Sequence, residues 1–114
     1  MIGSTIRVHR VVGPGLLESV YEECLAHQLG RDGFSVERQV VFPLVYGDLR
    51  IACGYRADLV VERRLIVELK SVERFLPVHD AQLLTYLRLS GCRIGLMLNF
   101  NVARLKDRLR RIVL

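Results

Sequence analysis

The sequence predicts a mixed α/β domain in which helices pack on a sheet. A helical pattern from Leu16 to about Leu29 is followed by strand-like runs that continue to Lys70. A second helical pattern begins after Pro77, and the dense apolar run from Arg93 to Phe100 follows it. With 114 residues, of which 51% are hydrophobic and 25% charged, the chain is expected to form a single domain over residues 1–114.

The first helix is expected to start at the break Gly13-Pro14-Gly15, because proline is favoured in the first helical turn. Gly30 and Gly33 supply its stop signal. Glu18 lies at the edge of the apolar stripe, and such a boundary glutamate is most often a solvated side chain. The residues expected in the stripe are Leu16, Leu17, Val20, Tyr21, Cys24 and Leu25. Residues 1–12 give no clear pattern.

Three strands are predicted before the loop at 62–64, and a fourth after it. The first, Ser35 to Val41, alternates and ends at Phe42-Pro43. The second, Leu44 to Tyr46, leads into a hairpin tip at Gly47-Asp48, and the third runs from Arg50 to Val61. Consecutive strands joined by tight turns indicate an antiparallel meander.

Charged residues interrupt the two apolar runs between Tyr55 and Lys70. Asp58 lies in the first run, and Glu68 and Lys70 lie in the second. Because alternate residues of a strand share a face, Glu68 and Lys70 project from the same side. Charge inside apolar sequence must be paired or must hold a metal. This segment is therefore the first candidate for a functional site.

The length of the loop decides whether the two acids meet. A loop of Glu62 to Arg64 pairs Val61 with Leu65 and places Asp58 directly across from Glu68. A loop restricted to Arg63 and Arg64 separates the acids. A three-residue loop prefers glycine at its left-handed position, and Glu-Arg-Arg offers none. We favour the three-residue loop or a bulge.

The second helix, from Val78 to about Ser90, carries a polar stripe of His79, Gln82 and Tyr86 between apolar flanks. Satisfied polar residues at the edge of a core would give the same pattern. After the stop at Gly91, the run from Arg93 to Phe100 fits a strand that is covered on both faces, joined by a crossover to a parallel neighbour. The basic tail after residue 100 is compatible with a short helix or a final strand, and a solvated edge is favoured over a phosphate-contacting arm.

Composition limits the cellular location and the kinds of partner that are expected. The formal net charge of +5 is compatible with polyanion binding, although many solvated surfaces have the same surplus. The cysteines Cys24, Cys53 and Cys92 are widely spaced and predict neither a disulfide framework nor a zinc site. No apolar run approaches the roughly 20 residues of a membrane span. A cytoplasmic protein without a membrane partner is expected.

Asp58 and Glu68 are the expected metal ligands. Mg²⁺ is held by one or two carboxylates, substrate phosphate oxygens and waters, so two protein carboxylates suffice. Lys70, on the same face as Glu68, would assist an attacking water or stabilise charge that develops on a phosphate. The combination is suited to hydrolysis of a phosphodiester.

The same residues carry a family resemblance. Asp58 followed by Glu68-Leu69-Lys70 resembles the core motif of the PD-(D/E)XK nuclease superfamily. The segment Gly15-Leu16-Leu17-Glu18-Ser19-Val20-Tyr21 is similar to the motif of its GxxExxY family. Ala57 replaces the proline of the superfamily name, and Arg108 follows Lys106-Asp107 where that family tends to have glycine. The further matching segments are Tyr55-Arg56-Ala57-Asp58, residues 67–71, residues 79–87 and residues 95–100.

The resemblance implies a restriction-endonuclease-like αβββαβ core with a Mg²⁺ or Mn²⁺ ion on Asp58 and Glu68. It implies that Lys70 is the catalytic lysine, that Glu18 reaches the site from the first helix, and that Gln82 and Tyr86 line it from the second. The implied partner is nucleic acid, with DNA ahead of RNA. A homodimer is compatible with this resemblance, because small nuclease domains often dimerise to engage two strands.

Two functions are weighed against each other. A metal-dependent nuclease is favoured, because every acidic and basic member of the constellation is present. The alternative is an accessory binding module on the same fold, which would bind nucleic acid or protein without turnover. A plain ion pair between Glu68 and Lys70 is the simplest structural explanation, and it leaves Asp58, Glu18 and Gln82 unexplained.

Overall fold

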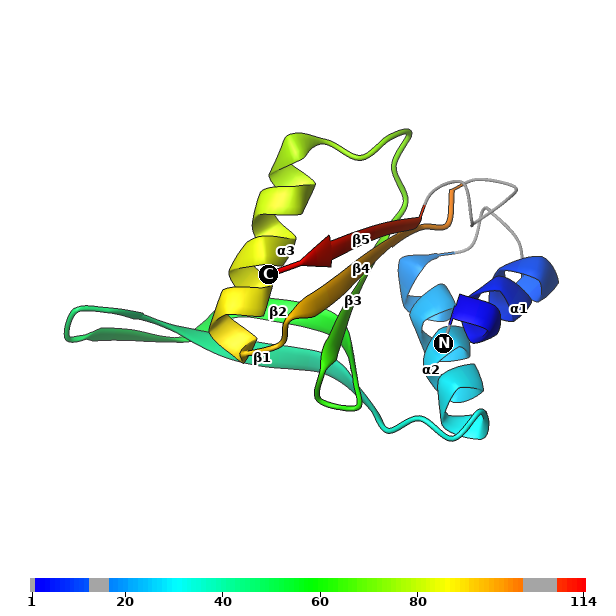
Figure 1. Ribbon diagram of the computed structural model, residues 1–114, viewed down its shortest axis with the longest axis horizontal. Coiled ribbons are helices and arrows are strands. Elements are labelled where there is room, and N and C mark those ends of the chain that lie inside the picture. Colours follow the sequence, from blue (N-terminus) through cyan, green and yellow to red (C-terminus); the bar gives the residue numbers. More distant parts are fainter. Residues whose placement is uncertain (1, 13–16, 102–108) are drawn as a thin grey trace.

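The computed structural model describes residues 2–12, 17–101 and 109–114, which form an α+β fold with a restriction-endonuclease-like core (Figure 1). The predicted fold class is therefore confirmed. The expected helix start at 13–16 lies outside the described residues. The elements are α1 (Ile2–Val12), α2 (Glu18–Arg31), β1 (Val36–Tyr46), β2 (Leu49–Val61), β3 (Leu65–Lys70), α3 (Pro77–Ser90), β4 (Ile94–Asn99) and β5 (Leu109–Val113).

The five strands form one mixed sheet in the order β1-β2-β3-β4-β5. β1, β2 and β3 are antiparallel neighbours, β3 and β4 are parallel, and β5 returns antiparallel to β4. The predicted crossover from β3 through α3 to a parallel neighbour is confirmed. The end of the basic tail is a strand rather than a helix, while its residues 102–108 lie outside the described part of the chain.

The prediction of two separate strands in 35–46 was wrong, because β1 continues through Pro43 as a single strand. The register with β2 shifts between Phe42 and Leu44, on an edge strand where a proline need not break a central ladder. Gly54 of β2 faces this irregularity. A Cβ at Gly54 would lie 2.7 Å from Leu44 Cβ, so the two strands approach closely only because this residue is glycine.

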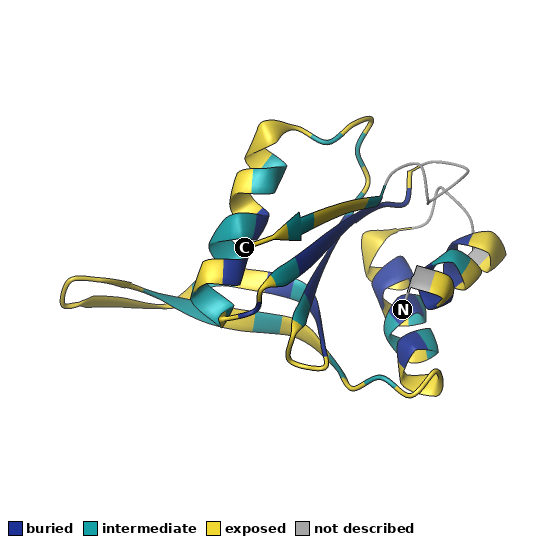
Figure 2. Ribbon diagram, viewed as in Figure 1, coloured by how far each residue is buried: buried dark blue, intermediate teal, exposed yellow. Residues whose placement is uncertain are grey.

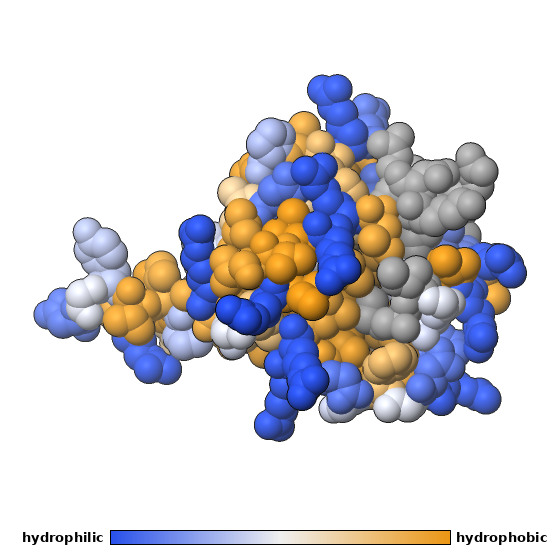
Figure 3. All heavy atoms as spheres, viewed as in Figure 1, coloured by the Kyte–Doolittle hydropathy of each residue, from blue (hydrophilic) through white to orange (hydrophobic). Residues whose placement is uncertain are grey.

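The far end of the β1–β2 hairpin projects from the body as a long ribbon (Figure 1). Figure 2 shows that this ribbon is exposed, and Figure 3 shows apolar side chains along it. Tyr46 is 79% exposed and Leu49 is 55% exposed, and they are paired across the hairpin on the same face. The ribbon is thus an apolar surface that the rest of the described chain leaves uncovered.

Helices cover both faces of the sheet. Leu83 and Leu87 of α3 pack against one face, together with Ala57, Val60, Ile66 and Met97. On the other face α2 contributes to a second cluster, whose buried members are Val8, Tyr21, Leu25, Leu29, Leu59, Val61, Val67, Leu69, Leu98 and Phe100. Because both faces of β3 are covered, the face that carries Glu68 is buried as well. No helix among the described residues is long and apolar enough to cross a membrane.

The helix α1 was not predicted, and polar residues occupy much of its buried face. Ser4, Thr5 and His9 are buried there together with Val8. His9 Nδ1 lies 3.3 Å from the Tyr21 hydroxyl. Arg7 and Arg10 lie on the opposite, exposed face, so the segment is amphipathic and the sequence did carry a signal for this helix.

The apolar stripe predicted for α2 was partly wrong. Leu17 and Val20 are 72% and 39% exposed, whereas Tyr21 and Leu25 are fully buried. Glu22 takes a buried position instead, at 4% exposure. The buried face of α2 is therefore rotated relative to the predicted stripe. It includes Glu22, which was not predicted as a site residue.

Candidate active site

The hairpin between β2 and β3 brings the two acids together. Val61 pairs with Leu65 across the loop Glu62 to Arg64, as the three-residue alternative predicts. Glu62 and Arg63 adopt left-handed backbone angles, with φ of 57° and 54°. The turn thus forms without the glycine that its geometry favours.

The regular backbone pairing of β2 with β3 ends at Leu59 and Val67. Beyond these residues, backbone N–H groups donate to carboxylate side chains. The backbone N–H of Asp58 donates to Glu68 Oε1 at 3.0 Å. The backbone N–H of Leu69 donates to Asp58 Oδ2 at 2.8 Å. The main chain therefore holds one oxygen of each carboxylate, so the acid pair is positioned by the fold.

Burial and mutual repulsion make these acids weak. The Glu68 side chain is 5% exposed, and burial, followed by the negative charge of Asp58, raises its pKa to about 8. Burial also raises the pKa of the half-buried Asp58, and the nearby charge of Glu22 adds to the rise. One buried and one half-buried acid, both with raised pKa values, make a site that would be stabilised by a cation.

Lys70 ends β3 and is half-buried beside the acids. Its positive charge lowers the pKa values of Asp58, Glu68 and Glu18, which partly offsets the effect of burial. Among the described residues Lys70 forms no ion pair within 4.0 Å. A plain Glu68–Lys70 ion pair therefore does not account for the arrangement.

Hydrogen bonds fix the chain at Lys70 and in the loop that follows it. The backbone N–H of Phe100 donates to the Lys70 carbonyl at 3.0 Å. The buried Asn99 side chain accepts from the N–H of Val72 at 3.2 Å and donates to the Val72 carbonyl at 2.6 Å. Asn99 therefore holds the loop after Lys70, a role that its place in an apolar strand did not predict.

Glu18 is the first residue of α2, and its helix end faces the acid pair. Neighbouring atoms remove part of its hydration and raise its pKa, although the residue lies at the surface. The charge of Asp58 raises this pKa further. The structure thus brings Glu18 within electrostatic range of the acids, as the resemblance implies.

A second set of polar residues lies behind Asp58. Arg38 of β1 donates from Nε and from Nη2 to one oxygen of the buried Glu22, at 3.2 and 2.9 Å. The Gln39 amide donates to the other Glu22 oxygen and also contacts Asp58 Oδ1 at 3.4 Å. Gln39 has a φ of 51° within a strand, which is uncommon for a residue other than glycine. Sequence reasoning missed Glu22, Arg38 and Gln39, because no local pattern links β1 to α2.

The residues of the polar stripe predicted for α3 lie in different environments. Tyr86 is half-buried with its ring edge on Tyr55, at a centroid distance of 5.4 Å. Burial and then the charges of Glu68 and Asp58 raise the Tyr86 pKa, so its hydroxyl lies near the acid pair. Gln82 is exposed and forms no hydrogen bond within the described part of the chain.

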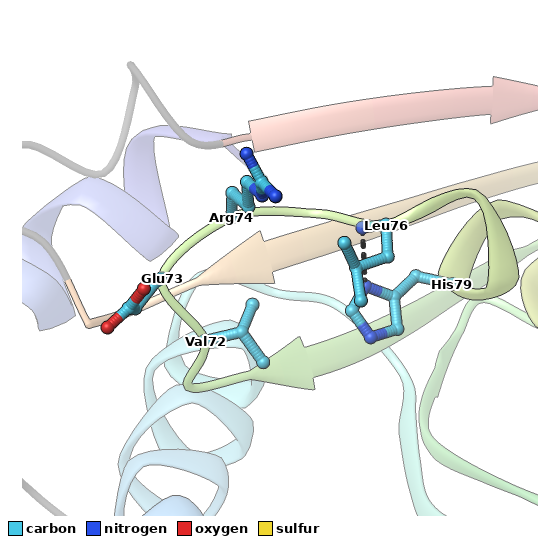
Figure 4. Close-up of a pocket in the computed structure, with 5 residues that line it drawn as sticks. All are labelled: Val72, Glu73, Arg74, Leu76 and His79. Carbon is cyan, nitrogen blue, oxygen red and sulfur yellow. Dashed lines mark hydrogen bonds between the residues drawn. The ribbon is translucent and has the colours of Figure 1, made fainter.

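His79 caps the start of α3. Its Nδ1 accepts a hydrogen bond from the backbone N–H of Leu76 at 2.9 Å, as the dashed line in Figure 4 shows. The ring therefore caps the helix with one nitrogen and keeps the other as an N–H donor. His79 also lines a pocket of about 330 Å³ in the loop that follows Lys70, together with Val72, Glu73, Arg74 and Leu76 (Figure 4).

The donor set suits a hard divalent cation. Asp58 and Glu68 offer carboxylate oxygens, which Mg²⁺ and Mn²⁺ prefer. Among the described residues no group of three His, Cys, Asp or Glu side chains forms a metal cage. A cation here would therefore keep waters or substrate oxygens in its remaining positions, which is usual for Mg²⁺.

The fold and the paired acids with a following lysine define a nuclease-like domain. The family model of the PD-(D/E)XK nuclease superfamily matches residues 1–112, so the chain belongs to this superfamily. The crystal structure of SSO0001 has a similar fold, with a TM-score of 0.61 and 22% sequence identity over 83% of this chain. This chain spans about half of that protein, 48% of its length. No curated protein matches the sequence.

Proposed function

We propose that the protein is a metal-dependent nuclease that hydrolyses phosphodiester bonds of nucleic acid, with DNA ahead of RNA. The observation that carries the proposal is the acid pair, in which Asp58 and Glu68 are each held by a backbone N–H of the opposite strand. A purely structural acid pair would be costly in its charged form, because burial raises the pKa of both acids and no basic group lies within 4.0 Å of them among the described residues. A catalytic role explains why the fold tolerates them.

Each residue has a proposed role. Asp58 and Glu68 would hold Mg²⁺ or Mn²⁺, which supplies Lewis-acid stabilisation and lowers the pKa of water when it is bound. Lys70 would stabilise charge that develops on the scissile phosphate or lower the proton affinity of the attacking water. Glu18 would hold a proton or orient a water at the open side of the site.

The α3 residues are proposed to line the substrate path. Tyr86 lies near both acids, and its raised pKa keeps the phenol protonated and able to donate to a phosphate oxygen. The exposed Gln82 side chain is available to contact the nucleic acid. We also propose that the chain belongs to the GxxExxY family. The position of Glu18 beside the acids, and the burial of Tyr21 in the core, support this assignment.

Cleavage of labelled oligonucleotides tests the proposal. Single-stranded DNA, duplex DNA and RNA are incubated with Mg²⁺, with Mn²⁺ or with a chelator. We expect cleavage with a metal only, and a loss of about 100-fold or more in Asp58→Asn and Lys70→Ala. Asp48→Asn at the exposed hairpin tip is the matched control and should cleave like the wild type.

The alternative, an accessory binding module, makes a different prediction in the same assay. It requires salt-dependent binding of the oligonucleotide without cleavage under any metal condition. Unimpaired cleavage in both Asp58→Asn and Lys70→Ala would instead refute the assigned residues. The cytoplasmic location and a homodimer stay predictions, and the dimer is checked by light scattering on the purified protein.

A further inference from the structure

Three arginines surround a pocket at the end of the sheet opposite Lys70. The pocket has a volume of about 240 Å³ and lies between the β2–β3 turn and the connection from α3 to β4. All three arginines are exposed. Its lining residues are Arg63, Arg64, Gly91, Cys92, Arg93 and Ile94. Two separate segments of the chain therefore bring guanidinium groups to one opening.

The turn that carries Arg63 and Arg64 is held firmly in place. The Glu62 backbone N–H donates to the Ser35 carbonyl at 2.7 Å, and the Ser35 N–H donates to the Glu62 carboxylate at 3.0 Å. The Cys92 thiol donates to the Arg63 carbonyl at 3.6 Å, which links the turn to the second segment. The pocket thus exists before any ligand binds.

Acidic side chains neutralise little of this charge. Arg63 approaches Glu37 at 3.6 Å, but the two side chains are 88% and 51% exposed, so the pair is weak. In the part of the chain that the structure describes, Arg64 and Arg93 form no ion pair. The backbone at Arg63 is also left-handed, although glycine would adopt that conformation more easily. The turn keeps an arginine at this strained position.

We propose that Arg63, Arg64 and Arg93 bind a backbone phosphate of a nucleic-acid strand, at a distance from the acid pair. The planar guanidinium group presents paired N–H donors that match the oxygens of a phosphate. Three such groups around one opening offer more N–H donors than a single carboxylate ligand could accept, which favours a phosphate. This inference rests on the proposed nuclease function for the identity of the ligand. Its experiment measures binding alone, so that the two proposals can fail separately.

The strand register gives the spacing between the two sites. Leu65 pairs with Ile94 beside the arginine pocket, and Lys70 pairs with Asn99 at the other end of β3. At a rise of about 3.3 Å per residue, these ends are roughly 16 Å apart. A DNA strand places one phosphate about every 3.4 Å along a duplex axis, so a strand that runs along β3 would pass about five phosphates between these two ends.

Fluorescence anisotropy of a labelled DNA duplex tests the inference, with a chelator present to prevent cleavage. The test variant is Arg64→Gln/Arg93→Gln. Its matched control is Arg7→Gln/Arg31→Gln, which changes the net charge equally at exposed positions on α1 and α2. We expect weaker binding in the test variant and a salt slope reduced by up to about 0.9, because one neutralised phosphate contributes about 0.9 to the slope on duplex DNA. The control should keep a slope close to that of the wild type.

The outcomes separate the two proposals. Equal slopes in the test and control variants, or no binding of DNA by the wild type, would overturn the phosphate site. A reduced slope in the test variant alone supports the site, even if cleavage is absent under every metal condition.

Discussion

The backbone N–H of Asp58 donates to the carboxylate of Glu68 at 3.0 Å, at the point where the pairing of β2 with β3 stops. The N–H of Leu69 donates in turn to Asp58 at 2.8 Å. Both carboxylates are thus hydrogen-bonded to the main chain of the neighbouring strand. The carboxylates are ordered by the backbone, which reduces the ordering that a metal would have to impose.

Titration of Mn²⁺ by calorimetry tests the metal site directly. Because Glu68 has a pKa of about 8, it is largely protonated at neutral pH, and a cation must displace that proton. Below that pKa, we expect the logarithm of the Mn²⁺ affinity to rise by about 1 for each unit by which the pH increases. Titrations in two buffers with different ionisation enthalpies should report about one released proton.

Asp58→Asn should lower the Mn²⁺ affinity by at least about tenfold, because it removes one of two carboxylate ligands. The exposed Asp48→Asn is the control and should bind as the wild type does. Equal binding by wild type and Asp58→Asn would eliminate the metal site, and with it most of the proposed mechanism.

The stability of the metal-free protein should fall as the pH rises. The folded-state pKa of Glu68 is raised from 4.5 to about 8, so the folded protein binds more protons than the unfolded chain between these values. The free energy of unfolding therefore decreases with rising pH across this window. Asp58, whose pKa is also raised, contributes in the same direction. Urea denaturation in the presence of a chelator, repeated across the window, measures the slope.

Glu68→Gln should flatten this dependence, since the amide has no proton to lose. Glu23→Gln, at an exposed position of α2, is the control and should keep the wild-type slope. A wild-type stability that rises between pH 4.5 and about 8 would show that the acids are not destabilised by burial.

The sequence predicted the acid pair because its determinants are local. Strand parity and the three-residue loop suffice to place Asp58 across from Glu68, and both follow from a short continuous segment. The proline at the start of α3 and the glycine after the helix likewise marked it correctly. These features depend on nearest neighbours along the chain or across one hairpin.

The polar residues behind the acid pair could not be predicted in this way. Glu22 and Gln39 meet only when α2 packs against the sheet, and the left-handed backbone of Gln39 has no signature in its neighbours. Sequence periodicity detects apolar burial, and Glu22 and Gln39 are polar. The helix α1 is a different case, because its exposed arginines opposite a buried face gave an amphipathic pattern that the sequence interpretation missed.

Gln39 is predicted to position Asp58. Gln39→Gly removes its contacts with Glu22 and Asp58 and relieves a left-handed backbone at the same time. We expect the Mn²⁺ affinity to fall by about 10- to 100-fold, which is typical when a partner of a metal ligand is removed. Stability should change little, because the relief of about 1 kcal/mol offsets the lost hydrogen bonds.

Two further variants make the prediction for Gln39 specific. Gln39→Asn tolerates the left-handed backbone but is one methylene shorter, so it should also lose affinity. Arg63→Gly relieves one of the two left-handed positions in the β2–β3 turn and should leave Mn²⁺ binding unchanged. If Gln39→Gly and Arg63→Gly have the same Mn²⁺ affinity, Gln39 does not position the site.

The placement of α3 depends on Gly95. A Cβ at this position would lie 2.7 Å from Leu83 Cδ1 and 2.8 Å from Leu83 Cγ, and Leu83 is fully buried between α3 and β4. Gly95→Ala should therefore cost about 1 to 3 kcal/mol of stability by overpacking, as measured by urea denaturation. Gly30→Ala is the matched control. It has no atom within 4 Å of the added Cβ, and it should stabilise α2 by about 0.5 to 1 kcal/mol.

The double variant Gly95→Ala/Leu83→Ala identifies the cause. If the clash with Leu83 is responsible, the cost of Gly95→Ala should be much smaller when Leu83 is already alanine, giving a coupling energy of about 1 kcal/mol or more. Because α3 also carries Tyr86 beside the acids, Gly95→Ala should reduce metal-dependent cleavage as well, while Gly30→Ala should not. Additive effects in the double variant would show that Gly95 and Leu83 are not in the predicted contact.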